Sequence, residues 1–346
     1  MKIGILTFHW ATNYGAILQA YALQEYMKEL GHEVEIINYK PRHFDFGWKY
    51  LRRPWLLKGL KKDLVARKKE LKLVPFREDR LITTKRRFFS VQELSLAKMT
   101  YDVVFSGSDQ VLNPSFTISG ENHPTSAYYL TFATRSKRIG YAVSFGCTVY
   151  PSNPLKYAEK WINTFDTVGA REDSGIKILD QMNYRGEKQV VPDPTILFGE
   201  KLFDGIKITK PKKENYLCVY ILRDAAEISS DNVVYVDELN NPVSMEEWLG
   251  LIIYSRGLIT NSYHGMIIAV LNHVPFVALK SQADDAGMND RFVTLLSRLD
   301  LEDRLVDSLD DYQQILSQTI SWEFVDAKLA EFRREGAMFI ENAILQ

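Results

Sequence analysis

The sequence predicts an α/β fold of two halves, each a mostly parallel sheet with helices on both faces. The chain has 346 residues, which exceeds the size at which one hydrophobic core usually stops growing. Short apolar runs alternate with segments of helical periodicity, a pattern typical of parallel sheets. A polar, Lys-rich interval at 205–215 separates two such series. We therefore expect one domain over residues 1–205 and a second over residues 206–346.

The first half opens with a strand, a helix and a strand. Residues 2–8 form a short apolar run, residues 16–30 have helical periodicity that Gly31 ends, and residues 34–39 form a second run. Further elements are expected as strands at 101–107, 137–146 and 166–173, and as helices at 154–165 and from Ser174. This order predicts a parallel sheet with crossover helices.

The second half repeats the alternation but contains one unusual connection. Its expected elements are strands at 216–222, 232–239, 257–262 and 275–279, and helices at 245–255 and 265–272. Only nine residues, 223–231, join the first two strands, whereas a crossover between parallel neighbours needs a dozen or more and usually a helix. Either these strands are not parallel neighbours, or a crossover helix is missing.

The composition excludes several classes of protein. Hydrophobic residues make up 46% and charged residues 25%, as in ordinary globular domains and unlike disordered chains. Cys147 and Cys218 have neither metal-type nor redox-type spacing, which fits a reducing compartment. The apolar run at 2–8 is too short for a signal peptide or a membrane span. We therefore expect a cytoplasmic protein.

Basic residues are concentrated in an insertion at about 42–90. From Arg42 to Arg87 there are sixteen Lys or Arg against five Asp or Glu, although the whole chain has a net charge of only −1. Trp and Leu recur at roughly helical spacing among the basic residues of 48–73. The segment is either a solvated helical face that packs on the domain, or a patch that lies against anionic lipid headgroups at the inner face of the membrane. Nucleic-acid binding is not expected, because no nucleic-acid-binding motif accompanies the charge.

Two candidate site segments follow expected strands of the first half. In the segment 9–24, Asn13 can cap a helix and Gly15 allows a ligand or backbone to approach, while His9 is either a satisfied loop histidine or a ligand contact. In the segment 106–113, Asp109 either hydrogen-bonds hydroxyls and accepts a proton, or caps a helix.

Two further segments carry cationic side chains. Arg171 ends a strand, and its planar guanidinium can hold a carboxylate or phosphate through two bonds. The alternative is a salt bridge to Glu172 or Asp173, but neighbouring side chains on a strand face opposite ways, which favours a partner elsewhere. Ser262, His264 and Gly265 lie where a strand gives way to a helix, so His264 is either part of an anion site or a structural histidine, and its position favours the anion site. The adjacent Asp284 and Asp285 are no strong chelate by themselves, and we expect no metal.

Six strings, in this order, resemble the polysaccharide pyruvyltransferase family over about 270 residues. They are HWATNYGAILQAYALQ (9–24), GSDQVLN (107–113), YAVSFG (141–146) with GARED (169–173), DPTILF (193–198) and TNSYHGMIIAVLNHVPFVAL (260–279). The resemblance implies two Rossmann-like domains facing across a cleft, similar to GT-B glycosyltransferases. It also implies an extra helical crossover where this chain has only the short 223–231 link.

The resemblance further implies an activity and site roles. The enzyme would transfer the enolpyruvyl group of phosphoenolpyruvate to a sugar hydroxyl of a free or lipid-linked glycan, forming a ketal without further cofactor. Arg171 and His264 would bind the donor, and Ser262 and Gly265 would help to hold its phosphate. The acid would be His264 or a neighbour, and the base Asp109. The acceptor side would comprise Asn13, Tyr14, Gly15, Ser108 and Asp109.

Two other functions stay open. A GT-B-like glycosyltransferase that uses a nucleotide sugar would have the same two-domain architecture. A non-catalytic relative that binds glycans would account for the short 223–231 link.

Overall fold

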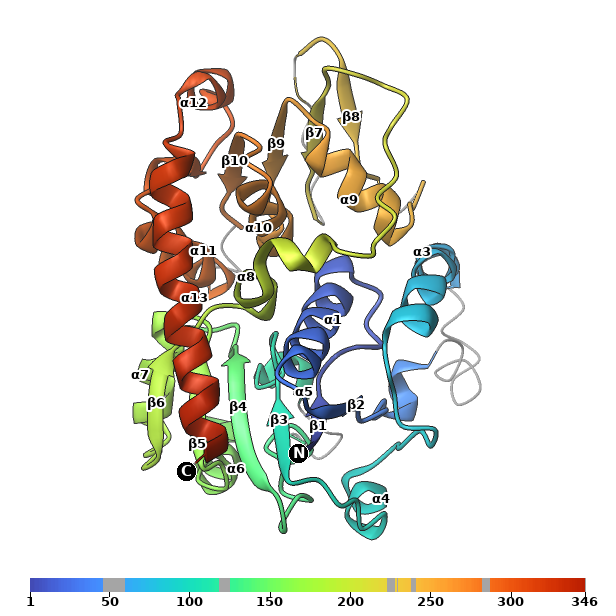
Figure 1. The fold of residues 1–346 in the computed structure, drawn as a ribbon, viewed down its shortest axis with the longest axis vertical. Coiled ribbons are helices and arrows are strands. Elements are labelled where there is room, and N and C mark those ends of the chain that lie inside the picture. Colours follow the sequence, from blue (N-terminus) through green and yellow to red (C-terminus); the bar gives the residue numbers. More distant parts are fainter. Residues whose placement is uncertain are drawn as a thin grey trace.

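The computed structural model describes residues 1–45, 60–117, 125–222, 228, 230–237, 241–281 and 287–345. Its two sheets lie one beyond the other along the long axis of the molecule (Figure 1). Within the described residues, one sheet has six strands in the order β2-β1-β3-β4-β5-β6, and the other has five in the order β11-β10-β9-β7-β8. All neighbouring strands are parallel. The predicted α/β fold of two parallel-sheet halves is confirmed.

The first half contains the elements expected from the sequence and some that were not. Its strands are β1 (Lys2–Leu6), β2 (Glu33–Ile36), β3 (Val103–Ser106), β4 (Lys137–Val143), β5 (Thr167–Ala170) and β6 (Glu187–Val190). Its helices are α1 (Tyr14–Glu29), η1 (Arg42–Phe44), α3 (Leu60–Arg80), α4 (Val91–Leu96), α5 (Pro114–Thr117), α6 (Ser152–Ile162) and α7 (Asp173–Gln181). Strand β6 was not predicted, because this edge strand is polar and partly exposed and has no apolar run.

The segment between the sheets and the second half add the remaining elements. The linking helices are α8 (Pro194–Phe198) and η3 (Gly199–Phe203). The second sheet contains β7 (Leu217–Tyr220), β8 (Val233–Tyr235), β9 (Gly257–Thr260), β10 (Phe276–Leu279) and β11 (Leu305–Val306). Its helices are α9 (Met245–Ile253), α10 (Tyr263–Leu271), α11 (Asp290–Leu299), η5 (Glu302–Arg304), α12 (Tyr312–Ser317) and α13 (Trp322–Leu345).

The short connection between β7 and β8 does join parallel neighbours. Leu217 pairs with Val233 and Val219 with Tyr235, so the alternative that these strands are not neighbours is wrong. The described residues of the connection form no helix, and 223–227 and 229 lie outside the described residues. Where a crossover helix would pack, Ile228 and α12 lie against the face of the second sheet that carries Leu217 and Val219.

Both sheets reverse their strand order at the same relative position. The chain runs from β1 to β2 on one side and returns to β3 on the other, and it does the same around β7. In open parallel sheets, ligands bind beyond the carboxyl ends of the strands at this reversal. The reversals between β1 and β3, and between β7 and β9, are therefore the expected places for a site.

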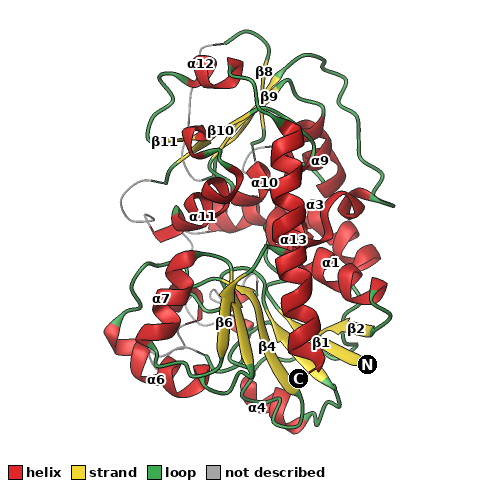
Figure 2. Ribbon diagram, turned by 60° about the vertical axis from the view of Figure 1, so that its left-hand side comes forward, coloured by secondary structure: helices red, strands yellow, loops and turns green. Residues whose placement is uncertain are grey.

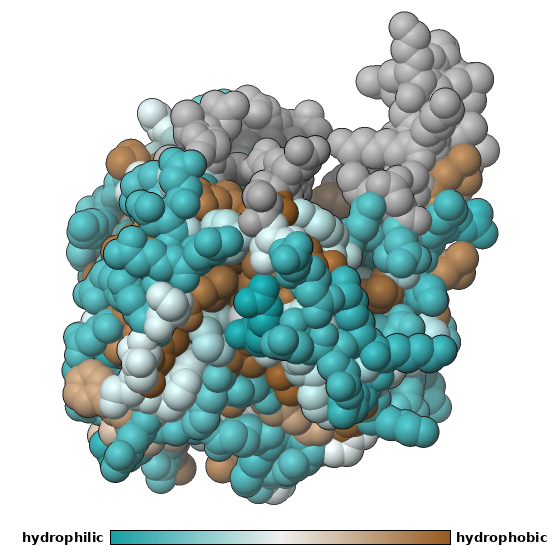
Figure 3. Space-filling model, turned by 90° about the horizontal axis from the view of Figure 1, so that it is seen from above, coloured by the Kyte–Doolittle hydropathy of each residue, from teal (hydrophilic) through white to brown (hydrophobic). Residues whose placement is uncertain are grey.

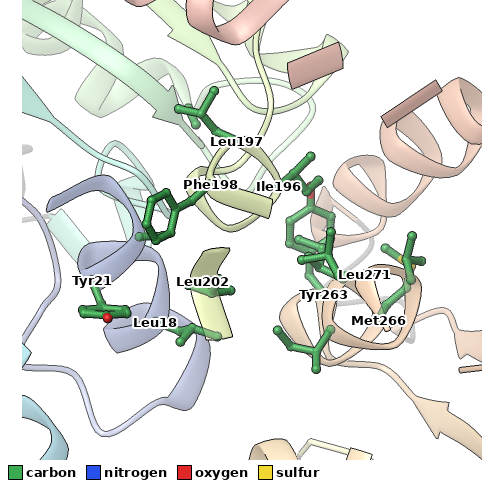
Figure 4. Close-up of a cluster of buried hydrophobic side chains, with 14 of the residues drawn as sticks. Leu18, Tyr21, Ile196, Leu197, Phe198, Leu202, Tyr263, Met266 and Leu271 are labelled. Atoms are coloured by element: carbon green, nitrogen blue, oxygen red, sulfur yellow. The ribbon is translucent and has the colours of Figure 1, made fainter. Parts of the chain in front are cut away.

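One hydrophobic core continues from the first sheet to the second. It includes apolar side chains of β1, β3 and β4, of α1, α8 and α10, and of β7, β9 and β10. Figure 4 shows the middle of this core, where Leu197, Phe198 and Leu202 lie between Leu18 and Tyr21 of α1 and Tyr263 of α10. The two halves therefore share buried apolar surface and are not joined by a linker alone.

Helix α13 extends from the second half to the first (Figure 2). Gly336 permits this approach, because a Cβ at that position would lie 2.5 Å from Cγ of Pro192. Further along, the ring of Phe339 lies 6.1 Å from that of Tyr141, and Lys137 Nζ donates to the carbonyl of Ile344 at 3.4 Å. The division at residue 205 stays a prediction, since residues from both sides of it bury each other.

The basic insertion is described only in part, because 46–59 lie outside the described residues. Helix α3 buries Leu73 and Phe76 in the shared core, which matches the alternative of packing on the domain. The same helix exposes Leu64 and Leu71, as well as Arg67, Lys68 and Lys72. None of the described helices is long and apolar enough to cross a membrane. The end of the molecule that carries the second sheet is largely hydrophilic (Figure 3).

Candidate functional site

Segments that follow five strands of the two sheets meet between the halves. Asn13 to Gly15 follow β1, Asp109 follows β3, Arg171 follows β5, Asp193 follows β6 and His264 follows β9. Four of these strands belong to the first sheet, and β9 belongs to the second. The site therefore lies where the carboxyl ends of both sheets face each other, at the two reversals of strand order.

Arg171 is buried among three carboxylates. Its Nη1 lies 3.0 Å from Oδ2 of Asp193, its Nη2 lies 3.3 Å from Oδ1 of Asp109, and its Nε lies 3.8 Å from Oε2 of Glu172. Burial by itself would lower the pKa of Arg171, but Asp109, Asp193 and Glu172 outweigh it and raise that pKa above its ordinary value. The expectation that Arg171 finds its main partners away from Glu172 is confirmed, although Glu172 also approaches it.

Asp193 joins the two halves of the site. Oδ1 accepts hydrogen bonds from the N–H of Thr195 at 3.0 Å and from its hydroxyl at 2.7 Å, which caps α8. Oδ2 accepts from Arg171 at 3.0 Å and lies 3.5 Å from Nε2 of His264. Burial would raise the pKa of Asp193, but His264, Arg171 and the Thr195 N–H outweigh burial and hold that pKa well below its ordinary value. A guanidinium and an imidazole from opposite halves thus meet at one carboxylate oxygen.

The imidazole of His264 fills the space left by the missing side chain of Gly15. A Cβ at Gly15 would lie only 2.1 Å from Nδ1 of His264. The group that comes close at Gly15 is therefore a side chain of the other half, and the predicted approach of a ligand or backbone there stays a prediction. Nε2 of His264 has no hydrogen-bond partner among the described residues, since its 3.5 Å contact with Asp193 is only an ion-pair distance.

Asp109 lies at the more accessible edge of the site. Its side chain is 16% exposed, whereas those of Arg171 and Asp193 are 0% exposed. Its φ of 78° is rare for a residue other than glycine, and such conformations are concentrated at functional sites. Its carboxylate faces Arg171, so the alternative that Asp109 caps a helix is wrong.

Buried polar atoms without hydrogen-bond partners gather around this cluster. In the part of the chain that the structure describes, they are Arg171 Nε, Glu172 Oε2, Ser174 Oγ, His264 Nε2 and Arg291 Nε. Native proteins leave few such atoms, and although Arg171 Nε faces Glu172 Oε2 at 3.8 Å and His264 Nε2 faces Asp193 at 3.5 Å, none of these atoms makes a hydrogen bond within the described residues. Burial raises the pKa of Glu172, although Arg171 and the hydrogen bond from Ser144 oppose that rise.

Several predicted site residues have structural partners instead of open faces. Tyr14 is buried, its ring stacks on Trp248 at 4.9 Å, and its hydroxyl donates to the carbonyl of Val243. Ser108 is buried, and its hydroxyl lies 3.1 Å from Oδ2 of Asp193. A contact of Tyr14 or Ser108 with an acceptor stays a prediction, since both side chains are buried and already have partners within the protein.

Other predicted residues act as helix caps or fill loops. Asn13 accepts from the N–H of Ala16 and caps α1, and Ser262 accepts from the N–H of Gly265 and caps α10. The Gly265 N–H is therefore occupied by Ser262, and a role for this pair or for Asn13 in ligand binding stays a prediction. His9 is buried, Nδ1 donates to the carbonyl of Thr7, and burial lowers its pKa to about 4, so it is a satisfied loop histidine.

Two functional candidates were missed from the sequence. Asp193 begins the string DPTILF, and nothing in that string shows that its carboxylate faces the other half of the molecule. Arg291 lies in the first turn of α11, far from any string that carried the resemblance. The described residues contain no group of three or more His, Cys, Asp or Glu that could hold a metal, and Asp284 and Asp285 lie outside the described residues.

Replacing Gly15 by Ala should destabilise the protein through His264. The added methyl would overlap the imidazole, and overpacking of this kind costs about 1–3 kcal/mol. Chemical unfolding of Gly15→Ala, His264→Ala and the double variant measures the coupling. In the His264→Ala background, Gly15→Ala should cause little further loss of unfolding free energy. If the losses of the two single variants simply add, the contact is contradicted.

Asp193→Asn should destabilise the protein in a pH-dependent way. Because the folded pKa of Asp193 lies below its unfolded value of about 3.9, its stabilisation is fully present above about pH 4 and is lost as pH falls toward the folded pKa. The difference in unfolding free energy between wild type and variant should therefore shrink by roughly 1 kcal/mol between pH 7 and pH 3. A difference that stays constant over this range would show that Asp193 is not ionised in the folded protein.

Comparisons with known proteins bear on both the family and the fold. A family model for polysaccharide pyruvyl transferase matches residues 13–282. The search of curated proteins finds no match. Among solved structures, UDP-GlcNAc 2-epimerase from Methanocaldococcus jannaschii aligns over 93% of this chain and 93% of its own, with 10% identity and a TM-score of 0.50.

Two glycosyltransferase structures are also similar in overall extent. UGT89C1 of Arabidopsis thaliana, complexed with UDP-L-rhamnose, covers 97% of this chain and 94% of its own at 10% identity, with a TM-score of 0.49. Spinosyn forosaminyltransferase SpnP covers 100% of both chains at 11% identity, with a TM-score of 0.48. At such identities a structural likeness concerns the fold alone, and the likeness to the epimerase agrees with two Rossmann-like halves of the GT-B type.

The family match extends across both sheets, from the start of α1 to beyond β10. It contains Asp109, Arg171, Asp193 and His264, the residues that meet between the halves. Because the matched residues 13–282 make up well over half of its 346 residues, the chain belongs to the polysaccharide pyruvyl transferase family.

Proposed function

We propose that this protein transfers the enolpyruvyl group of phosphoenolpyruvate to a sugar of a polysaccharide or of its lipid-linked precursor, forming a pyruvate ketal. One observation carries the proposal beyond the family match. Arg171 and His264, from opposite halves, lie 3.0 and 3.5 Å from the same oxygen of Asp193. A guanidinium and an imidazole are thus close enough to reach one small anion.

The donor has the charges that this cluster can hold. Phosphoenolpyruvate presents a carboxylate and a phosphate on a three-carbon frame, and guanidinium groups bind both kinds of anion through paired hydrogen bonds. The polar atoms without partners on Arg171 and His264 point to spare hydrogen-bonding capacity for it. Positioning of the donor against the acceptor would supply much of the acceleration.

The proposed reaction balances with the groups at hand. A proton adds to C3 of phosphoenolpyruvate, C2 becomes an oxocarbenium-like centre, and a sugar hydroxyl adds to C2 with loss of its proton. Phosphate then leaves from C2, and a second hydroxyl of the sugar adds there to close the ketal. Of the two hydroxyl protons, one replaces the proton given to C3 and the other leaves with the phosphate.

His264 is the proposed acid for C3, and Asp109 the proposed base for the acceptor hydroxyl. A positioned acid or base contributes typically 10²–10⁴-fold. Asp109 is the more accessible of the carboxylates around Arg171, which suits a group that meets an incoming sugar. Asn13, at the start of α1, remains the other proposed contact on the acceptor side.

The alternative of a non-catalytic glycan-binding protein was motivated by the short link between β7 and β8. The contacts of Arg171, Asp193 and His264 form without a helix in the described part of that link. This arrangement favours a working enzyme. A nucleotide-sugar glycosyltransferase would have the same fold, so the two functions are distinguished by which ligand binds.

Phosphoenolpyruvate should raise the melting temperature of the protein, and phosphate should be released from it when the correct glycan is added. His264→Asn should lower the release rate at least 100-fold, because it removes the proposed acid. His273→Asn is the matched control, since His273 is exposed and pairs with Asp326. Stabilisation by UDP-sugars, with none by phosphoenolpyruvate, would favour the glycosyltransferase instead.

We further propose that the protein is cytoplasmic and contacts the inner membrane surface through α3. The exposed Leu64 and Leu71 lie beside Lys68 and Lys72, a combination that binds anionic lipid surfaces. Sedimentation with anionic vesicles should decrease as salt rises, and Lys68→Glu with Lys72→Glu should weaken it. The same change at Lys210 and Lys212 is the control, and equal losses in both would remove α3 as the contact.

A further inference from the structure

Helix α11 brings a second arginine to the site between the halves. The N–H of Ser174 donates to Oδ2 of Asp290 at 2.9 Å, and the N–H of Asp173 donates to Oγ1 of Thr294 at 3.1 Å. These bonds fasten the first turns of α7 and α11 to each other. Arg291 follows Asp290, so its position relative to Arg171 is set by contacts between the two halves.

Both arginines border one aromatic ring. The guanidinium carbon of Arg171 lies 5.0 Å from the centroid of the Tyr263 ring, and that of Arg291 lies 5.4 Å from it. Tyr263 is the neighbour of His264 in the chain, so the three cationic or potentially cationic side chains surround one small region. An anion there would contact residues of both halves.

The charges of the two arginines are compensated very differently. Arg171 forms ion pairs with Asp109, Asp193 and Glu172 within 4.0 Å. Arg291 has neither an ion pair within 4.0 Å nor a hydrogen bond to any of the described residues, and its Nε is buried without a partner. Burial of the guanidinium and the charge of Arg171 lower the pKa of Arg291 to about 10, although the more distant carboxylates of Asp109 and Glu172 oppose that shift.

We propose that Arg291 is a donor-binding residue that supplies positive charge for an anionic group of phosphoenolpyruvate, because no described residue holds it in an ion pair, while the charge of Arg171 is largely neutralised by carboxylates. This inference rests on the proposed function for the identity of the donor. The class of the ligand, an anion with a phosphate or carboxylate group, is inferred from the geometry and charge of the site alone. Arg171 then mainly orients the donor, because Asp109 and Asp193 hold its guanidinium in place.

The test compares Arg291→Met with two other variants in the full chain. Arg298→Met is the matched control, because Arg298 lies on the same helix and pairs with Glu335 at 2.9 Å. Without ligand, Arg291→Met should melt at the same temperature as wild type or higher, whereas Arg171→Met should melt lower, because it leaves buried carboxylates unpaired. A drop for Arg291→Met as large as that for Arg171→Met would overturn the inference.

Ligand titration then separates this inference from the proposed function. Millimolar phosphate and phosphoenolpyruvate should each stabilise wild type and Arg298→Met, and the shift should be lost in Arg291→Met. Arg291→Lys should restore part of it and raise KM for phosphoenolpyruvate at least tenfold with a smaller change in kcat, since it keeps the charge but loses the fork. A full phosphoenolpyruvate shift in Arg291→Met refutes the role of Arg291 and leaves pyruvyl transfer standing.

The remaining outcomes are equally decisive. If phosphate stabilises wild type through Arg291 while phosphoenolpyruvate does not, the anion site is supported and pyruvyl transfer is refuted. If neither ligand stabilises wild type, both proposals fail.

Discussion

The ionised carboxylate of Asp193 is the constraint on which the site depends. It is fully buried, and both of its oxygens are occupied by residues of the first half, with His264 of the second half beside one of them. Breaking a buried charge pair costs about 3–5 kcal/mol, so the position of Asp193 is strongly determined. A ligand that takes Arg171 or His264 away from this carboxylate must offer at least as good an anion. Ligand binding and the fit between the halves are therefore coupled.

The packing around Asp193 explains why it lies at this junction. Asp193 caps α8, and α8 lies in the shared core between α1 and α10. The cap, the core and the ion pairs therefore all depend on the same short stretch of chain. Gly15 adds a steric condition, because the imidazole of His264 occupies the volume that any larger residue would take. The site is thus assembled from both halves rather than held by one.

Most of the fold, and part of the site, could be predicted from the sequence. Apolar alternation located strands such as β1 and β9, because buried parallel strands need continuous apolar runs. It failed for β6, where the edge of the sheet tolerates polar residues. Arg171 and His264 were found because strand ends and helix starts leave a local signal. Asp193 and Arg291 were not, since their roles come from contacts that exist only after the two halves have packed together.

The position of helix α13 affects how the chain can fold during translation. Phe339 of this helix covers Tyr141 and approaches Gly169 on the first sheet, yet it is translated after every strand of both sheets. A nascent chain on the ribosome therefore exposes that apolar face until residues 322–345 have emerged. Domains that fold in sequence during translation avoid such exposure, and incompletely covered intermediates are prone to aggregate. Chaperone dependence of this protein would then be greatest before residues 322–345 are free to dock.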